Sequence, residues 1–346
     1  MAEAVAWVML AVLAAYACAG GTDYGAGFWD LCAGGAERGE RPRRLIDHAM
    51  EPVWEANNVW LIFLMVIMWT GFPPFFAAVF SAMWLPLVLV VLGLVLRGAG
   101  FALRRPARRL TQRRVYGAVF AVSSLLVPFF FGAVIGGVAS GRVAPGTPAS
   151  ADAWANPTSA VTGLMAVGAT AFLGAVFLTA DARRYQAPDL VDYFRLRAWW
   201  SLAALVVLAF IGLPVTHHDA AYVWDRITGG VPLALIVVAA ATALVTALLL
   251  ARRALRWCRY TAVAGVVLVI AAWGAAQRPY LLPTSLTVGQ AAGVPPTLTW
   301  LLIVTGIAVL LVGPGLGLLY WLDTRGKLEA LTDADTEEER PPAEPV

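Results

Sequence analysis

The sequence predicts an all-α integral membrane protein with nine transmembrane helices, and three observations lead to this fold class. The first is the composition, because 60% of the 346 residues are hydrophobic and only 14% are charged, well outside the usage of soluble globular domains. The second is that the charges cluster and leave long uncharged runs, close to the roughly 20 apolar residues that span a bilayer. The third is the uneven distribution of Lys and Arg among the connecting loops.

The uncharged runs divide into nine helical segments. The run 56–96 is long enough for two spans and is broken at Pro73-Pro74. The run 279–322 begins as a proline-rich loop and continues as one helix from about residue 298. The predicted helices cover residues 4–22, 53–70, 76–96, 115–139, 158–180, 198–215, 231–250, 260–276 and 298–321, each to within a few residues.

The basic residues set the predicted orientation. With nine spans the loops form two alternating sets, and one set holds all of the 25 Lys and Arg except Arg142, Arg226 and Arg278. By the positive-inside rule that set faces the cytoplasm, so the N-terminus lies outside and the C-terminus is cytoplasmic. The net charge of +3 therefore reflects topology, and no nucleic-acid partner is expected.

The chain is predicted to form one polytopic membrane domain over residues 1–325, followed by an acidic, disordered cytoplasmic tail over 326–346. The first apolar run lacks a basic segment before it, so we interpret it as a retained helix and not as a cleaved signal. This helix is expected to end in a glycine-rich stretch that contains Asp23 near the membrane boundary. Asp23 is either an interfacial carboxylate in water or a buried functional acid, and the stretch alone leaves both open.

The second helix opens with acids and amides ahead of an apolar run. Pro52 suits the first turn of a helix, and Glu51, Glu55 and Asn58 then fall on one face at i, i+4 and i+7. An ionised acid at mid-bilayer costs about 2.5–3.5 kcal/mol, so an acid one turn inside needs a partner or a water path. We assign a functional role to Glu55 and a structural one to Glu51, which precedes the helix and complements its dipole.

The later helices contribute less chemistry. Arg97 is the deepest residue of the basic segment after the third helix and could pair with a carboxylate at the same level. The other arginines are explained as topology determinants that contact anionic lipid. The fourth to eighth helices carry no central charge and are expected to be scaffold.

Several kinds of chemistry are excluded. The three histidines lie in loops or at helix ends, so no pair of helices offers buried imidazoles to a haem or metal, and neither is expected in this chain. The three cysteines form no C-x-x-C pair. The sequence also lacks a phosphate-binding loop, a nucleophile elbow and a dinucleotide fingerprint.

Four stretches in register are specific enough to indicate a family: 21–27 (GTDYGAG), 52–62 (PVWEANNVWLI), 97–104 (RGAGFALR) and 279–287 (PYLLPTSLT). With them the chain resembles subunit II of cytochrome bd type quinol oxidases. The resemblance implies two four-helix bundles plus one peripheral helix in a bacterial inner (cytoplasmic) membrane. It also implies a heterodimer with subunit I, which carries haems b and d and the quinol site.

The resemblance further implies a role for individual residues. Acids that match Asp23 and Glu55 lie on a proton path from the cytoplasm, where the second is often Asp and this chain has Glu. Asn57 and Asn58 can hold water on that path but cannot titrate. A small single-helix subunit and a structural quinone or lipid are further partners that such a complex could contain.

The sequence therefore predicts a non-haem subunit of a quinol:oxygen oxidoreductase that is inactive alone and supplies protons for the reduction of oxygen to water. The alternative is a proton-coupled secondary transporter, whose polar helices would carry substrate, although internal repeats typical of that class are not visible. A purely structural anchor would leave Asp23 and Glu55 without a purpose.

Overall fold

The computed structural model describes residues 1–35, 38–50, 54–104 and 110–324, with the side chains of 54–56, 110, 113, 316, 319–321, 323 and 324 outside the description. It is built almost entirely of helices, with one short two-stranded sheet. The long elements are α1 (Ala2–Leu31), α3 (Trp54–Gly71), α5 (Trp84–Arg104), α6 (Leu110–Ala139), α7 (Pro157–Arg184), α8 (Pro188–Asp219), α10 (Gly230–Ala251), α11 (Leu255–Gln277) and α13 (Pro295–Thr324). The short ones are α2 (Glu40–Met50), α4 (Pro73–Ala82), η1 (Ala151–Ala153), α9 (Ala221–Ile227), β1 (Tyr280–Leu282), β2 (Leu286–Thr287) and α12 (Val288–Ala291).

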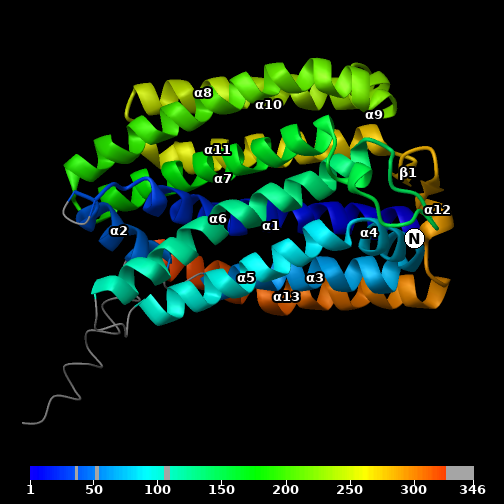
Figure 1. The fold of residues 1–346 in the computed structure, drawn as a ribbon, viewed down its shortest axis with the longest axis horizontal. Coiled ribbons are helices and arrows are strands. Elements are labelled where there is room, and N and C mark those ends of the chain that lie inside the picture. The colour runs from blue at the N-terminus through cyan, green and yellow to red at the C-terminus, as the bar shows by residue number, and fades with distance from the viewer. Residues whose placement is uncertain (36–37, 51–53, 105–109, 325–346) are drawn as a thin grey trace, which may run out of the picture. The chain divides into compact units, whose positions relative to one another are not determined.

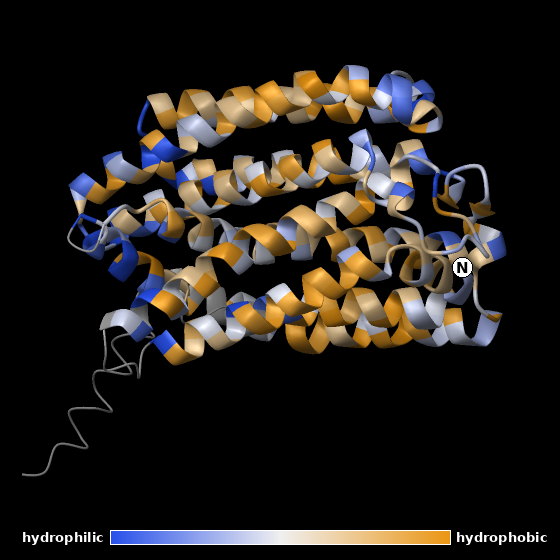
Figure 2. Ribbon diagram, in the orientation of Figure 1, coloured by the Kyte–Doolittle hydropathy of each residue, from blue (hydrophilic) through white to orange (hydrophobic). Residues whose placement is uncertain are grey.

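Eight of the described helices are long and apolar enough to cross a membrane, and the bent pair α3–α4 raises the number to nine if it counts as one span. Each of the nine predicted segments overlaps one of these spans. Figure 2 shows apolar residues along most of their length. The prediction of an all-α, multi-pass membrane protein is thereby confirmed.

The helices from Ala2 to Gly293 form one compact unit, and α13 belongs to a second. Within the first unit the helices run alongside one another in successive layers, with α8 and α10 in one layer, then α7 and α11, then α1 and α6, and then α3 and α5 (Figure 1). α7 packs against α1, α6, α8 and α11, while α1 packs against α3, α6 and α7. α1 and α7 therefore form the centre of this unit.

Glycines allow α1 and α7 to approach closely. A Cβ atom on Gly25 would collide with the backbone carbonyl of Thr170, and one on Gly174 would lie 2.5 Å from the carbonyl carbon of Gly25. The indole Nε1 of Trp29 donates a hydrogen bond of 2.8 Å to the Ala171 carbonyl across the same contact. Small residues at a membrane helix crossing let the two backbones touch, which offsets the helix propensity that glycine lacks.

This contact explains an error in the predicted end of the first helix. α1 does not end at residue 22 but continues through the glycine-rich stretch to Leu31. Asp23 is consequently inside the helix, eight residues before its end. The glycines act there as packing residues and not as helix terminators.

The predicted third helix is wrong in its first part. Residues 76–82 belong to α4, and the span itself begins at Trp84. The chain bends by 115° between α3 and α4. Pro73 and Pro74 occupy the first turn of α4, where a missing N–H is tolerated, so the prolines start a new helix in a new direction.

Two connections are more ordered than simple loops. The connection between α1 and α3 contains α2, whose buried side includes Leu45, Ile46 and Met50. The proline-rich segment after α11 forms the antiparallel pair β1–β2, with Leu282 opposite Leu286. Both of these leucines are buried, so this segment packs against protein as expected.

Candidate functional site: a buried polar chain along α1

Asp23 is a buried acid on α1. Its side chain is 4% exposed, and its Oδ2 accepts a hydrogen bond of 2.6 Å from Nδ2 of Asn57 on α3. Asn57 is itself 2% exposed. Of the two interpretations of Asp23, the structure favours the buried acid over an interfacial carboxylate in water. A carboxyl group in such a place is held by a neutral amide that binds either protonation state.

The structure describes the other predicted site residues in and before α3 in less detail. Glu51 lies outside the described residues, and Glu55 is described only through its backbone, as the second residue of α3. Asn58 is half-buried and makes contacts of its own. The amide that reaches Asp23 is Asn57, which the helical periodicity of Glu51, Glu55 and Asn58 did not place on their face.

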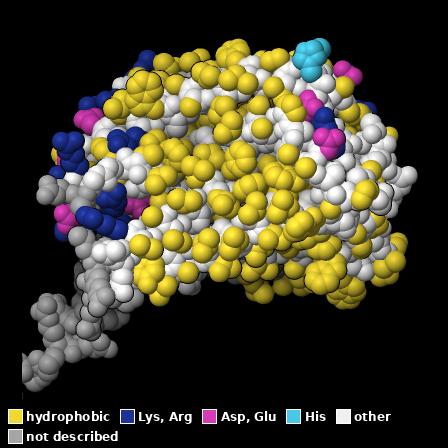
Figure 3. Space-filling view, viewed as in Figure 1, with side chains coloured by type: hydrophobic (Ala, Val, Ile, Leu, Met, Phe, Trp, Pro, Cys, Tyr) yellow, Lys and Arg dark blue, Asp and Glu magenta, His cyan; other side chains and the backbone are white. Residues whose placement is uncertain are grey.

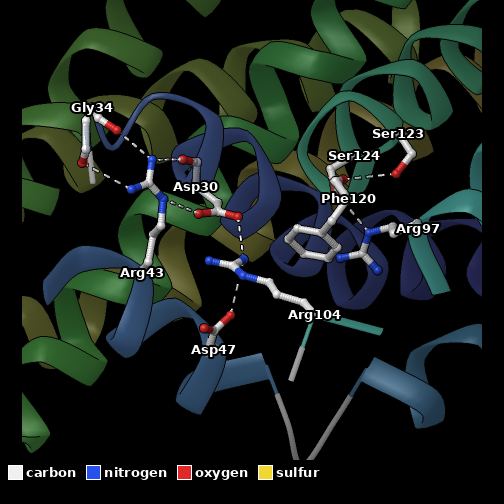
Figure 4. A network of polar contacts seen from close by, with 10 residues as sticks. Asp30, Gly34, Arg43, Asp47, Arg97, Arg104, Phe120, Ser123 and Ser124 are labelled. Carbon is white, nitrogen blue, oxygen red and sulfur yellow. Dashed lines mark hydrogen bonds and ion pairs between the residues drawn. The ribbon is translucent and has the colours of Figure 1, made fainter. Parts of the chain in front are cut away.

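Arg97 is a second buried charge near Asp23. It projects from α5, is 6% exposed, and stacks its guanidinium 4.7 Å from the ring centre of Tyr24 and 5.1 Å from that of Phe120. Its Nε donates to Oγ of Ser124 at 3.1 Å (Figure 4). Nη2 of Arg97 has no hydrogen-bond partner among the described residues.

The expected pairing of Arg97 with a carboxylate is therefore not found among the described side chains, where no ion pair within 4.0 Å includes this residue. Two aromatic faces take the place of a carboxylate. A guanidinium over an aromatic ring is attracted by the ring quadrupole, and this attraction strengthens when water is excluded. Tyr24 is fixed in turn by Tyr16, whose hydroxyl lies 2.8 Å from that of Tyr24.

A third buried charge, Asp30, sits near the end of α1. It is 3% exposed and forms ion pairs with Arg43 of α2 at 2.9 Å and with Arg104 of α5 at 2.7 Å. Arg104 also reaches Asp47 of α2 at 3.5 Å. Figure 4 shows both arginines converging on Asp30 from different elements. Arg43 further donates to the Gly34 carbonyl at 2.6 Å, which anchors the chain beyond α1.

Sequence reasoning missed Asp30 and the two arginines that hold it. A signal was available, because Asp30 follows Asp23 by seven residues, or two helical turns, and so lies on the same face of α1. Arg43 and Arg104 were counted only among the loop charges that set topology. The interactions depend on α2 and on the final turn of α5, neither of which the pattern predicted.

The charged groups at the opposite end of the unit have a structural role. Asp219, the last residue of α8, accepts hydrogen bonds from Arg142 at 2.5 Å and from the Thr158 hydroxyl and N–H at 2.6 and 3.1 Å. The hydrogen bond to Asp219 raises the pKa of the Arg142 guanidinium in the loop after α6. These contacts connect α8, the α6–α7 loop and the start of α7.

No cluster of three or more His, Cys, Asp or Glu that could hold a metal occurs among the described residues. His48 lies against the Tyr185 ring, with 5.2 Å between ring centres, and His217 lies 5.0 Å from Trp224. Both rings are therefore in aromatic contacts at the ends of helices.

Together these features define the class of protein: a polytopic helical membrane protein with several buried polar and charged groups in or against its central helix α1. The family described as cytochrome bd terminal oxidase subunit II matches the chain over residues 1–323. The chain belongs to the cytochrome bd terminal oxidase subunit II family, which confirms the resemblance seen in the sequence.

Individual relatives agree with this assignment. The cytochrome bd-I ubiquinol oxidase subunit 2 of Escherichia coli (strain K12) is 27% identical over 220 residues, which cover 60% of this chain and 54% of that protein. The matched region thus spans about half the length of that relative. The cytochrome bd ubiquinol oxidase subunit 2 of Bacillus subtilis (strain 168) is 32% identical over 112 residues, or 32% of each chain.

The fold also matches a solved structure. A chain in the structure of the bd oxidase from Geobacillus thermodenitrificans superposes with a TM-score of 0.76 at 23% identity, covering 93% of this chain and 98% of that chain. At this level of identity the comparison shows a shared fold.

Proposed function

We propose that this chain is the non-haem subunit II of a quinol:oxygen oxidoreductase and that it supplies part of the path by which protons reach the site of oxygen reduction. The family assignment supports the first part. The single observation that carries the second is the buried carboxyl group of Asp23, held by Asn57 between α1 and α3.

The path runs along one face of α1 and the start of α3. Asp23 and Glu55 are the titrating groups, and the side-chain amides of Asn57 and Asn58 hold water between them. A carboxyl group suits this task because it takes up and releases a proton, and burial moves its proton affinity toward the working pH. Arg97 contributes a buried guanidinium group from α5 close to this path.

The orientation follows from the distribution of arginines. Figure 3 shows Lys and Arg gathered at one end of the visible face, the end where α1 and α5 finish. We refer to this end, defined by Arg41, Arg43, Arg44 and Arg104, as the basic end. In the proposed topology of nine spans the basic end faces the cytoplasm, the N-terminus lies outside, and the protein resides in the bacterial inner membrane.

The redox chemistry belongs to a partner. Subunit I would carry haems b and d and oxidise quinol, and a small single-helix subunit could complete the complex. Two four-helix bundles and a peripheral helix would form the membrane domain of this chain. A proton-coupled transporter would also use a buried acid, but only the oxidase requires a haem-bearing partner that co-purifies with quinol oxidase activity.

Two conservative substitutions test the proton path in the assembled complex. Glu55→Gln is expected to lower steady-state oxygen consumption at least tenfold, because the amide cannot carry a proton. Asp23→Asn should act in the same direction, because it removes the second titrating group of the proposed path. Haem content should stay near that of the wild type in both variants.

Asp181→Asn provides the matched control. This acid lies on α7 at the basic end and pairs with Arg259 of α11, away from α3. Its loss is expected to leave turnover unchanged. Full turnover of a correctly assembled Glu55→Gln complex with quinol in excess would show that the carboxylate is structural and that the proposed path is wrong.

A further inference from the structure

Asp30 forms the central contact of a cluster that, among the described residues, contains two acids and two arginines and lies at the basic end of the proposed path. Two carboxylates, Asp30 and Asp47, face two guanidinium groups, Arg43 and Arg104, and the three elements α1, α2 and α5 contribute them. Asp30 is the most buried member, and both of its oxygens are occupied by arginine. Asp47 is 37% exposed, so the cluster extends from the protein interior to the surface.

The cluster and the proposed proton carrier share one face of α1. Seven residues separate Asp23 from Asp30, which corresponds to about 10 Å along a helix. Figure 4 shows Arg97 and Ser124 to one side of the Asp30 cluster. A proton that enters at the basic end and travels along this face passes the Asp30 cluster before it reaches Asp23.

A doubly ion-paired carboxylate is a poor proton carrier. Both carboxylate oxygens of Asp30 already accept charge-assisted hydrogen bonds from guanidinium groups, so neither oxygen is free to pass on a proton. Its value is its fixed negative charge. Without it, Arg43 would lose its ion-pair partner among the described residues and Arg104 would keep the longer contact to the half-exposed Asp47. The positive charge at the entrance to the path would increase by one unit.

We propose that Asp30 is a positioning residue for proton uptake: its charge compensates those of Arg43 and Arg104 at the entrance to the path. The inference rests on the proposed function of Asp23. One unit charge about 10 Å away, at an effective dielectric constant of about 20, changes the protonation equilibrium of an acid on the order of tenfold. Loss of the Asp30 charge is therefore felt at Asp23 although the two residues do not touch.

The test compares Asp30→Asn with the charge-balanced double variant Asp30→Asn/Arg43→Gln in the purified complex. Asp30→Asn is expected to slow oxygen consumption about tenfold at pH 8 and less at pH 6, because the uncompensated positive charge disfavours protonation. The turnover curve should shift by about one pH unit toward acid. Of the residues whose side chains the structure describes, the charged groups that face Asp30 are Arg43 and Asp47 from α2 and Arg104 from α5, while Arg97 faces Asp23 from the same helix α5.

The double variant should recover most of the wild-type rate, since Arg104 then remains balanced by Asp47. A structural account predicts the reverse, because Arg43→Gln also removes hydrogen bonds to the carbonyls of Gly34 and Gly35. A double variant as slow as Asp30→Asn would overturn the proposal. A wild-type rate and pH profile in Asp30→Asn would overturn it as well.

Asp47→Asn keeps the proposal testable if Asp30→Asn fails to assemble. Asp47 is partly exposed, so its substitution leaves no fully buried arginine unpaired, and solvent screening should reduce its effect to about threefold in the same direction. An unchanged rate and pH profile would count against the proposal. A slow Asp23→Asn complex combined with a normal Asp30→Asn complex would overturn only this inference, whereas a normal rate in both Asp23→Asn and Glu55→Gln would overturn the proposed proton path.

Discussion

At the scale of single residues, this protein holds its buried charges in three different ways. Asp30 is paired with two guanidinium groups, Asp23 is held by an amide, and Arg97 is held by two aromatic rings and a serine. A charge in the membrane interior is costly unless it is paired, solvated or functional. Among the described residues, Nη2 of Arg97 is a buried nitrogen without a hydrogen-bond partner. It has capacity for another partner, such as a water molecule.

The Tyr16–Tyr24 pair provides a test of how strongly this local arrangement is held. Tyr24→Phe keeps the ring beneath Arg97 but leaves the buried Tyr16 hydroxyl without its partner, which should destabilise the complex by about 1–3 kcal/mol. Adding Tyr16→Phe removes the orphaned hydroxyl, so the double variant should be more stable than Tyr24→Phe alone. Thermal unfolding of the purified complex measures both.

Tyr222→Phe serves as the control for that comparison. Its hydroxyl bonds the Arg278 carbonyl at 3.0 Å in an exposed position, where water can replace it. The unfolding temperature should therefore change little. A double Tyr16/Tyr24 variant less stable than either single variant would contradict the idea that the hydroxyls matter chiefly to each other.

The sequence identified the buried charged residues themselves but not the side chains that contact them. Asp23 and Arg97 stand out in the sequence because each is a charge within or beside a long apolar run. The partners Asn57, Tyr24 and Ser124 could not be assigned, because helical periodicity gives the face of a residue but not the neighbour that covers it. Asp30 lay within reach, since its spacing from Asp23 is a whole number of turns.

At the scale of elements, the span pattern was predicted well and the ends of helices were not. Bilayer thickness sets the length that an apolar run needs to span the membrane, so the apolar segments could be recognised from their length. The bend at Phe72 was signalled by Pro73 and Pro74, but its angle of 115° depends on what α4 packs against. The extension of α1 to Leu31 escaped prediction because glycines that end helices in water can pack helices in membranes.

The contact between α1 and α7 yields a prediction at this scale. Gly174→Ala places a Cβ atom 2.5 Å from the Gly25 carbonyl carbon and 2.7 Å from its Cα, so the helices must separate. Because α1 carries Asp23 and Asp30, separation should sharply lower the yield of haem-containing complex. Gly265→Ala on α11, where a Cβ meets open space, should assemble normally. Equal yields from the two variants, measured by membrane immunoblot and haem spectrum, would show that the close crossing is dispensable.

At the scale of the whole molecule, apolar side chains cover both sides of the layered unit, so exposure alone does not separate a partner interface from a lipid surface. On α3, Ile62 and Trp69 are 64% and 67% exposed, and on α8 and α10 Phe210 and Leu244 are 68% and 62% exposed. The position of the buried Asp23–Asn57 pair does distinguish a partner interface from a lipid surface. Under the proposed function a proton at Asp23 passes to the haem of the partner without being lost to lipid, so we expect the partner close to α3, whose Asn57 contacts Asp23.

Site-specific photo-crosslinking tests this placement. A photoreactive residue at Ile62 or Trp69 is expected to give adducts with the haem-bearing subunit in native membranes. The same probe at Phe210 or Leu244 should give lipid adducts only, because the layers of α7 and α1 lie between those positions and α3 (Figure 1). Each probe variant is first checked for normal haem content, so that a missing adduct reflects distance and not failed assembly. Adducts confined to Phe210 and Leu244 would place the partner against α8 and α10. Protons leaving Asp23 would then have to cross the centre of the unit, where the polar side chains of α7 between residues 158 and 179 are all hydroxyl groups, such as Thr170 and Thr179.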